Sequence, residues 1–246
     1  MIVINNRFCI YIEYKNIKID KSIDINKTIE LDSIKDHIEN LSSFHKALMG
    51  YEFSVGDELP NNLGSYIEQC KTSLKCAERY INMLKEKENL NQVEEFITKE
   101  GPLAIKLGKK SIEHIYDKDF LSVIRRAMDR KEIILGYFAP YNLRKDNNTL
   151  YVHNIDNCAY DFIEMDYIKM LMKIKKNKKD ILTNELIQYC TEKENLPFSS
   201  YEIIKSFTMF PYNFIRNLNR YKERRKPWTL EEYYRRIYES IDGDMS

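Results

Sequence analysis

Glycine and proline are scarce in this chain of 246 residues, which contains seven glycines and six prolines. Because these two residue types mark most turns, we expect few turns and mainly helices. No run of about 18 apolar residues occurs, so no membrane-spanning helix is expected. The first residues lack a basic stretch followed by a long apolar core, so export by a signal peptide is not expected either.

The chain also lacks an excess of one charge and a pattern of paired cysteines. With 39 basic and 38 acidic residues, its net charge is +1. This balance predicts no general attraction to nucleic acid or to an anionic membrane. The five cysteines form no CxxC pair, and their odd number indicates reduced, partly buried thiols in a cytosol: Cys9, Cys70, Cys76, Cys158 and Cys190.

What is present suits one globular domain, since 43% of the residues are hydrophobic and 31% are charged. Alternating apolar and polar residues over 7–19 predict one or two strands. Steps of three and four between apolar residues predict helices over the ranges 33–48, 63–84, 102–115 and 118–130. Pro102 is expected at the first position of its helix.

The second half of the chain contains one predicted hairpin and then helices. Its strands are expected at 131–136 and 149–155, joined through the segment KDNN. From residue 160 onwards the pattern is helical, and Thr229 with Glu232 predicts a capping box for the last helix. The fold class is therefore a mostly helical α+β domain, with a small sheet wedged between helices.

Polar side chains follow both predicted strands of the hairpin. Tyr137 comes directly after Leu135-Gly136, Asn142 lies five positions further on, and Asn154-Ile155-Asp156 ends the returning strand. Phosphoryl transfer uses a carboxylate to take the proton of the substrate hydroxyl, and a carboxylate with an amide to hold magnesium. The order of elements fits such a site, but the position of the base holds a tyrosine.

The residues around the hairpin extend this pattern. Four further segments contribute: SSFHKALMGY at 42–51, NNLGSY at 61–66, DNCAYDFIEMD at 156–166 and FPYNFIRNLNRYKERRKPW at 210–228. Together with the hairpin, the chain resembles the CotS-like spore coat proteins over residues 8–241. This family is a branch of the kinase-like fold shared with aminoglycoside and choline phosphotransferases. The resemblance implies the helical C-terminal lobe of that fold.

The departures from the family pattern bear on catalysis. In the family the loop reads His-Gly-Asp, four residues and Asn, and the returning strand ends Ile-Asp-Phe-Asp. By this resemblance Tyr137 replaces the base and Asn154 replaces the metal-binding aspartate. A tyrosine side chain ionises only at about pH 10, so it cannot accept a proton at neutral pH as a carboxylate does. Loss of each function is expected to cost about 10²–10³ in rate.

Two points of this comparison have alternatives. Sliding the second motif by two positions would make Asp156 the metal-binding carboxylate, whereas the ungapped register keeps Cys158 and Asp161 at the family spacing and favours Asn154. Asn142 and Asp156 are interpreted either as turn caps of the hairpin or as a residual metal site.

The resemblance also divides the chain. It implies that residues 1–20 are a remnant strand and hinge of the small lobe, and that 21–246 are the kinase-like C-terminal lobe containing the hairpin at 131–156. Neither GxGxxG nor GxxxxGK occurs. No cofactor is therefore expected, with residual binding of a magnesium-bound nucleotide as the exception.

Other candidate sites are weaker. The four histidines, His37, His45, His114 and His153, are dispersed and do not suggest a metal site, and His45 is expected to be packed or hydrogen-bonded on a helix face. Two basic runs, 173–180 and 216–228, are interpreted as solvated helix ends or as a contact for an acidic protein. Trp228 is expected to anchor the C-terminal helices.

The leading functional hypothesis is a pseudokinase that serves as a structural or assembly protein of the spore coat. The resemblance implies a location in the mother-cell cytoplasm and then in the coat, with other coat proteins as partners. A residual magnesium-dependent small-molecule phosphotransferase using Asn142 and Asp156 is the first alternative. The second is a pseudoenzyme that associates with an intact kinase-like homologue and regulates it.

Overall fold

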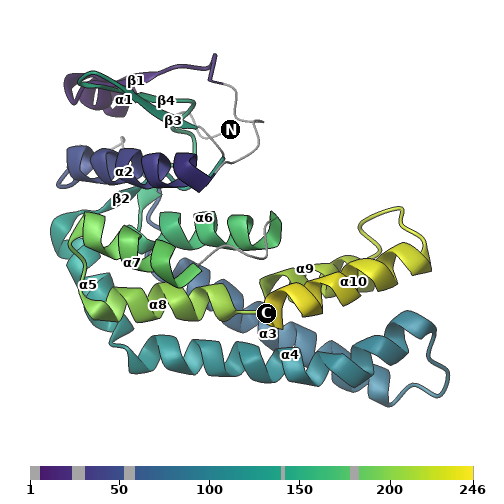
Figure 1. Ribbon diagram of the computed structural model, residues 1–246. Helices are drawn as coiled ribbons and strands as arrows, with labels where there is room; N and C mark the ends of the chain where they lie inside the picture. Colours follow the sequence, from purple (N-terminus) through teal and green to yellow (C-terminus); the bar gives the residue numbers. More distant parts are fainter. Residues whose placement is uncertain (1–5, 24–30, 53–58, 140–141, 178–182, 246) are drawn as a thin grey trace.

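The computed structural model describes residues 6–23, 31–52, 59–139, 142–177 and 183–245. Helices dominate it (Figure 1). In chain order the elements are α1 Asn6–Tyr14, β1 Ile17–Ile19, α2 Leu31–Leu48, α3 Ser65–Lys85, α4 Gln92–Asp117, α5 Phe120–Arg130, β2 Ile133–Ile134, β3 Leu143–Asp146, β4 Thr149–Val152, β5 Ala159–Tyr160, α6 Glu164–Asn177, α7 Thr183–Glu194, α8 Phe198–Met209, α9 Tyr212–Lys222 and α10 Leu230–Met245.

The apolar periodicity located most helices of the first half correctly. The helices predicted at 33–48 and 63–84 are α2 and α3, and the one predicted at 118–130 is α5. The apolar stripe predicted for this helix began at Leu63, which precedes α3 and is half-buried. Its other six residues are the buried face of α3: Ile67, Cys70, Leu74, Ala77, Ile81 and Leu84. Burial of one apolar face every three to four residues is what stabilises these helices.

The predicted start of the next helix was wrong. α4 begins at Gln92, and Pro102 lies in its interior. The Asn91 side chain accepts hydrogen bonds from Val93 N and Glu94 N, and Glu94 Oε2 accepts one from Asn91 N, which completes a capping box. This cap starts the helix ten residues before the proline. Packing of α4 against α3, α8 and α10 holds it through Pro102, despite the backbone hydrogen bond that proline lacks.

The N-terminal segment was only partly predicted. Residues 17–19 form a strand as expected, but 6–14 are the helix α1. Phe8 and Ile12 are fully buried, whereas Ile10 and Tyr14 are exposed by 59% and 81%. A strand would have placed all four side chains on one face. A helix puts Phe8 and Ile12 on one face and Ile10 and Tyr14 on another, because positions two apart lie on different helix faces. Tertiary packing thus overrides the local alternation.

The hairpin was predicted with the wrong partners. β3 pairs antiparallel with β4 through a two-residue turn, in which Asn147 has a φ of 52°. The strand predicted at 131–136 is reduced to β2, which pairs with β5 instead. Gly136 has a φ of 75°, which turns the chain away after β2 and leaves a loop before β3.

The three-stranded sheet has the order β1-β4-β3, and β1 runs parallel to β4. Figure 1 shows this sheet with α1 and α2 at one end of the molecule, α6, α7 and α8 in the middle, and the long pair α3 and α4 at the other end. The pair α9 and α10 extends to one side, over α3 and α4. Since β1 pairs with β4, the segments 1–20 and 21–246 share a sheet, and the domain boundary between them stays a prediction.

A buried ion cluster fastens α5 to α6. The guanidinium of Arg126 donates to both carboxylate oxygens of Glu132, at 2.9 and 3.0 Å, and to both of Glu164, at 2.8 and 2.7 Å. Both carboxylates are almost completely buried. Breaking a pair of this kind is costly, because it leaves an uncompensated buried charge.

Among the described residues, no helix has the length and apolarity required to cross a membrane.

Candidate active site in the loop between β2 and β3

The backbone of the loop after β2 is held by a buried carboxylate. Asp166, in the first turn of α6, accepts hydrogen bonds from Leu135 N at 2.7 Å and from Gly136 N at 2.8 Å. Burial would raise the pKa of Asp166, but His45, Lys169 and the Leu135 N–H outweigh it and hold that pKa below its usual range. Asp166 is therefore ionised at neutral pH and fixes the two residues that precede Tyr137.

His45 connects this carboxylate to a second one. Its Nε2 lies 3.0 Å from Asp166 Oδ2 and its Nδ1 lies 2.7 Å from Glu194 Oε1. Burial alone would lower the pKa of His45, but the charges of Glu194 and Asp166 raise it to about 9. Tyr167 donates a further hydrogen bond of 2.6 Å to Glu194 Oε1. An imidazolium between two carboxylates thus joins α2, α6 and α7, and the prediction that His45 is packed and hydrogen-bonded is confirmed.

Gly136 allows the loop to pass close to the chain after β4. A Cβ atom at this position would lie 2.1 Å from the carbonyl oxygen of Asn157. No other residue type fits there without moving the backbone, and the positive φ favours glycine as well. The glycine of the Leu135-Gly136-Tyr137 segment therefore has a steric function in this loop.

The position expected for a catalytic base presents a phenol. The Tyr137 side chain is 39% exposed. Two lysines of α6 lie around it: Lys169 Nζ donates to Gly136 O at 3.1 Å, and Lys173 Nζ donates to Phe138 O at 3.2 Å. The Lys173 ammonium is also 5.8 Å from the centre of the Tyr137 ring. The loop is thus tied to α6 through its backbone carbonyls as well as its N–H groups.

Asn142 closes the loop. Its Nδ2 donates to Tyr137 O at 2.8 Å, and His153 N donates to Asn142 O at 2.9 Å. Its Oδ1 is buried and has no hydrogen-bond partner among the described residues. A buried amide oxygen without a partner is uncommon, because desolvating it is unfavourable. Residues 140 and 141, which belong to the same loop, lie outside the described residues.

The structure brings some of the predicted site residues together and not others. Asn142 contacts Tyr137 directly, and its pairing with His153 puts Asn154 at the same end of the hairpin. Asn154 is half-buried and Asp156 is exposed.

The resemblance of the sequence implies a magnesium site here, and the donors present suit magnesium poorly. Asn142 Oδ1 is an oxygen ligand of the kind that magnesium takes. However, its predicted companions are the Asn154 amide and the exposed carboxylate of Asp156, which supply one negative charge between them. The described residues contain no group of three His, Cys, Asp or Glu side chains that could hold a metal ion.

A groove of about 370 Å³ lies beside the loop, between α2 and β3. His37 lines it, and its ring is 5.0 Å from that of Phe138 in an edge-to-face arrangement. Burial lowers the pKa of His37 to about 4, so its imidazole is neutral at pH 7. Leu143, the residue after Asn142, lines the same groove.

Sequence reasoning missed Asp166, Lys169 and Lys173 as supports of the loop. Asp166 was detectable, because it lies in the apolar segment FIEMDYIKML, where a buried acid requires partners. The two lysines had no such signal, since lysines on a helix are ordinarily solvated. All five cysteines are free, and Cys70, Cys158 and Cys190 are buried, as predicted.

Comparisons with known proteins support the fold. No family model matches the chain, and no curated protein matches it. A solved structure, an aminoglycoside phosphotransferase from Alicyclobacillus acidocaldarius, is similar with a TM-score of 0.70 at 10% sequence identity. The match covers 92% of this chain and 66% of the other chain. The chain therefore has a kinase-like, aminoglycoside phosphotransferase-type fold, and the narrower resemblance to CotS-like proteins stays a prediction.

Proposed function

We propose that this protein is a pseudokinase: it keeps the kinase-like fold and the ordered loop, but it does not transfer phosphate. The observation that carries the proposal is the loop itself. Its backbone is held by Asp166 and by Lys169, and Asn142 closes it. Yet the side chain that this framework presents at the position of the base is the phenol of Tyr137. A preserved framework around a replaced functional group is typical of a fold retained for binding or assembly.

The second replaced group supports the same proposal. Asn154 stands where the resemblance places the metal-binding aspartate, and an amide cannot offset the charge of magnesium as a carboxylate does. Because positioning and electrostatic stabilisation supply nearly all of the catalysis in phosphoryl transfer, the loss of both carboxylates removes most of it.

The biological role that we propose is structural or assembly work in the bacterial spore coat. It rests on the resemblance of the segments at 42–51, 61–66, 156–166 and 210–228 to CotS-like proteins. The protein would be made in the mother-cell cytoplasm and then held in the coat by other coat proteins. A fluorescent fusion in sporulating cells tests this role: it should collect around the developing spore, and a uniformly dispersed signal would contradict the assignment.

A residual small-molecule phosphotransferase is the second candidate, favoured by one observation. The buried Oδ1 of Asn142 has no partner in the described structure, which suits an oxygen ligand awaiting a cation. A pseudoenzyme that regulates an intact homologue is a further candidate, which co-purification with such a homologue would support.

Thermal unfolding with and without millimolar Mg-ATP separates these candidates. A ligand present at 100 times its Kd stabilises the folded state by about 2.7 kcal/mol, which raises Tm by several degrees. We expect no magnesium-dependent shift. A clear shift that is lost in Asn142→Ala or Asp156→Ala, but kept in Asn148→Ala of the exposed hairpin turn, would replace the pseudokinase proposal with the residual enzyme.

A further inference from the structure

The basic run at 216–228 does not behave as one solvated helix end. Lys222 and the residues from Glu223 to Pro227 are exposed, whereas Arg216 and Arg220 are half-buried. These two arginines are four positions apart on α9 and therefore share a face of that helix. The basic run therefore divides into an exposed turn and two half-buried arginines on one face of α9.

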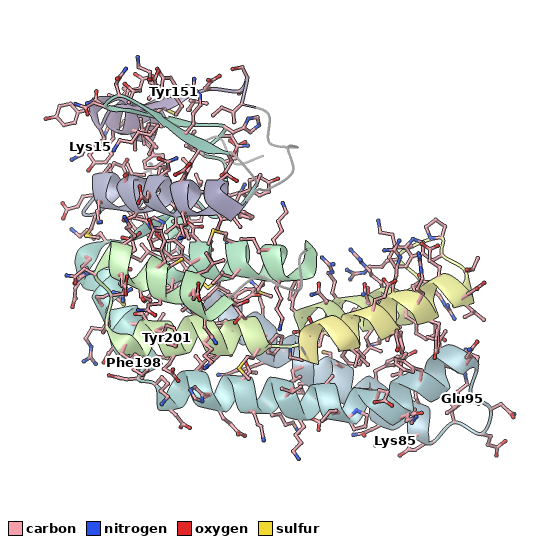
Figure 2. The ribbon with its side chains drawn as sticks, viewed as in Figure 1. Lys15, Lys85, Glu95, Tyr151, Phe198 and Tyr201 are labelled. Atoms are coloured by element: carbon pink, nitrogen blue, oxygen red, sulfur yellow. The ribbon has the colours of Figure 1, made fainter. Side chains whose placement is uncertain are left out.

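That pair lines a cleft to which three helices contribute. The cleft has a volume of about 430 Å³. α6 supplies Lys175, α9 supplies Arg216 and Arg220, and α10 supplies Arg236. These lining residues place the cleft where the C-terminal end of α6 approaches the α9–α10 pair, and Figure 1 shows how these helices are arranged. The side-chain view in Figure 2 shows several nitrogen-tipped side chains over α9 and α10. Among the other lining residues that the structure describes, Glu239 carries the one negative charge.

The cations of the cleft are poorly neutralised by the protein. Arg236 pairs with Glu232 at 3.0 Å. Within the described part of the chain, Arg220 donates only to the neutral Asn217 side chain, at 3.3 Å, and Arg216 Nε is buried without a hydrogen-bond partner. Among the side chains that the structure describes, no carboxylate forms an ion pair with Arg216, Arg220 or Lys175. After burial, the charges of Arg216 and Arg236 are the causes that lower the pKa of Arg220.

The carboxylate that acts on Lys175 is that of Asp244, and it is hydrogen-bonded to other groups. Asp244 raises the pKa of Lys175 against the lowering effect of burial, which dominates. However, its two oxygens accept hydrogen bonds from Asn213 Nδ2 at 3.0 Å and from Phe214 N at 2.9 Å, at the start of α9. Asp244 thus stabilises the start of α9, and among the described residues it forms no ion pair with Lys175.

We propose that this cleft binds a small soluble anion with two or more phosphate or carboxylate groups. Guanidinium groups bind such oxyanions through paired hydrogen bonds, and the cleft is within the usual size of small-molecule sites. A ligand of this kind offsets the mutual repulsion of Arg216, Arg220 and Arg236. The concave shape favours a small solute over a flat membrane surface. The proposal does not depend on whether the loop at Tyr137 is catalytic.

The only tryptophan of the chain gives a direct measurement. The Trp228 ring lies 4.2 Å from the Arg236 guanidinium carbon and 5.6 Å from that of Arg220. We expect titration with pyrophosphate or citrate, without magnesium, to change Trp228 fluorescence in a saturable way. Arg216→Gln and Arg220→Gln should each weaken binding by at least about tenfold, because each removes a charge-assisted contact.

Arg225→Gln is the matched control. It makes the same chemical change in the same basic run, but Arg225 is exposed and pairs with Glu223. Unchanged binding in this variant, with each variant shown to fold by circular dichroism, would support the cleft. If Arg216→Gln fails to fold, Lys175→Gln removes a cation from another helix and should weaken binding as well.

Four results would overturn the proposal. The first is no saturable response to either anion, and the second is an equal loss of affinity in Arg225→Gln and the cleft variants, which would indicate non-specific charge effects. The third is binding to phosphatidylserine vesicles without binding to pyrophosphate or citrate, which would make the patch a membrane contact. A response lost in Asn142→Ala, but not in the arginine variants, would locate the anion at the loop instead.

Discussion

Gly136 shows how much a single residue decides in this loop. Its backbone conformation is one that other residues rarely adopt, and its α-carbon faces the Asn157 carbonyl. Tyr137 follows it directly, so the orientation of this tyrosine depends on the close approach. The role of Gly136 in this loop is steric, and it does not depend on catalysis.

We therefore expect Gly136→Ala to destabilise the protein more than the same change at Gly64. Both glycines have a φ near 75°, but a Cβ at Gly64 meets nothing within 4 Å. Gly64→Ala should cost about 1–2 kcal/mol for the left-handed backbone alone. Gly136→Ala should add about 1–3 kcal/mol because the backbone must shift to avoid the clash. Urea denaturation of the two variants measures the difference, and equal losses would show that the close approach is unimportant.

The helix α4 shows how local signals compete within one element. The capping box at Asn91 starts it, and Pro102 does not end it. Asn91 also contacts α9, since its Nδ2 donates to the Tyr221 hydroxyl at 2.9 Å. The same side chain therefore caps one helix and joins it to another.

Asn91→Ala is expected to lower the free energy of unfolding by about 1–2 kcal/mol, at the upper end of the range for a lost N-cap. Thr229→Ala is a suitable comparison, because Thr229 caps α10 with one exposed hydrogen bond of 3.2 Å to Glu232 N. It should cost clearly less. Thermal or chemical denaturation checks both variants, and a larger loss for Thr229→Ala would contradict the double role of Asn91.

For the molecule as a whole, His45 is the junction of three helices and the loop. Its pKa of about 9 lies above the ordinary histidine value of about 6.5, so the folded state holds the proton more tightly than the unfolded state. The contribution of this proton to the free energy of unfolding is fully present below about pH 6.5, and it is lost as the pH rises through about 9. The partners Asp166 and Glu194 have lowered pKa values, so their contribution is lost at acid pH.

Nuclear magnetic resonance of the histidine rings tests this assignment without any variant. The His45 signals should titrate near pH 9, and those of His37 near pH 4. The free energy of unfolding should also fall between about pH 6.5 and 9, because the folded state still binds the proton that the unfolded state has already released. A His45 that titrates at or below its ordinary value would show that the two carboxylates do not hold it as an imidazolium.

Much of the candidate site was predictable, because it depends on residue identity. The tyrosine directly after Leu135-Gly136, and the five-residue step from Tyr137 to Asn142, are visible in the sequence. The hydrogen bond from Asn142 to the Tyr137 carbonyl, and the anchoring of the loop by Asp166, were not. They join residues whose separation along the chain gives no periodic signal. Whether the site lacks catalysis stays a prediction.

The sequence by itself determined most of the helices, the scarcity of turns and the chemical groups available at the loop, since these follow from local periodicity and residue type. Only the tertiary structure decided that 6–14 is a helix, that β2 pairs with β5, and that the basic run divides into an exposed turn and a cleft. The physical reason is that burial and charge pairing depend on which distant segments meet. An alternating segment becomes a helix when only every fourth side chain finds a partner, and an arginine becomes part of a cleft when two other helices approach it.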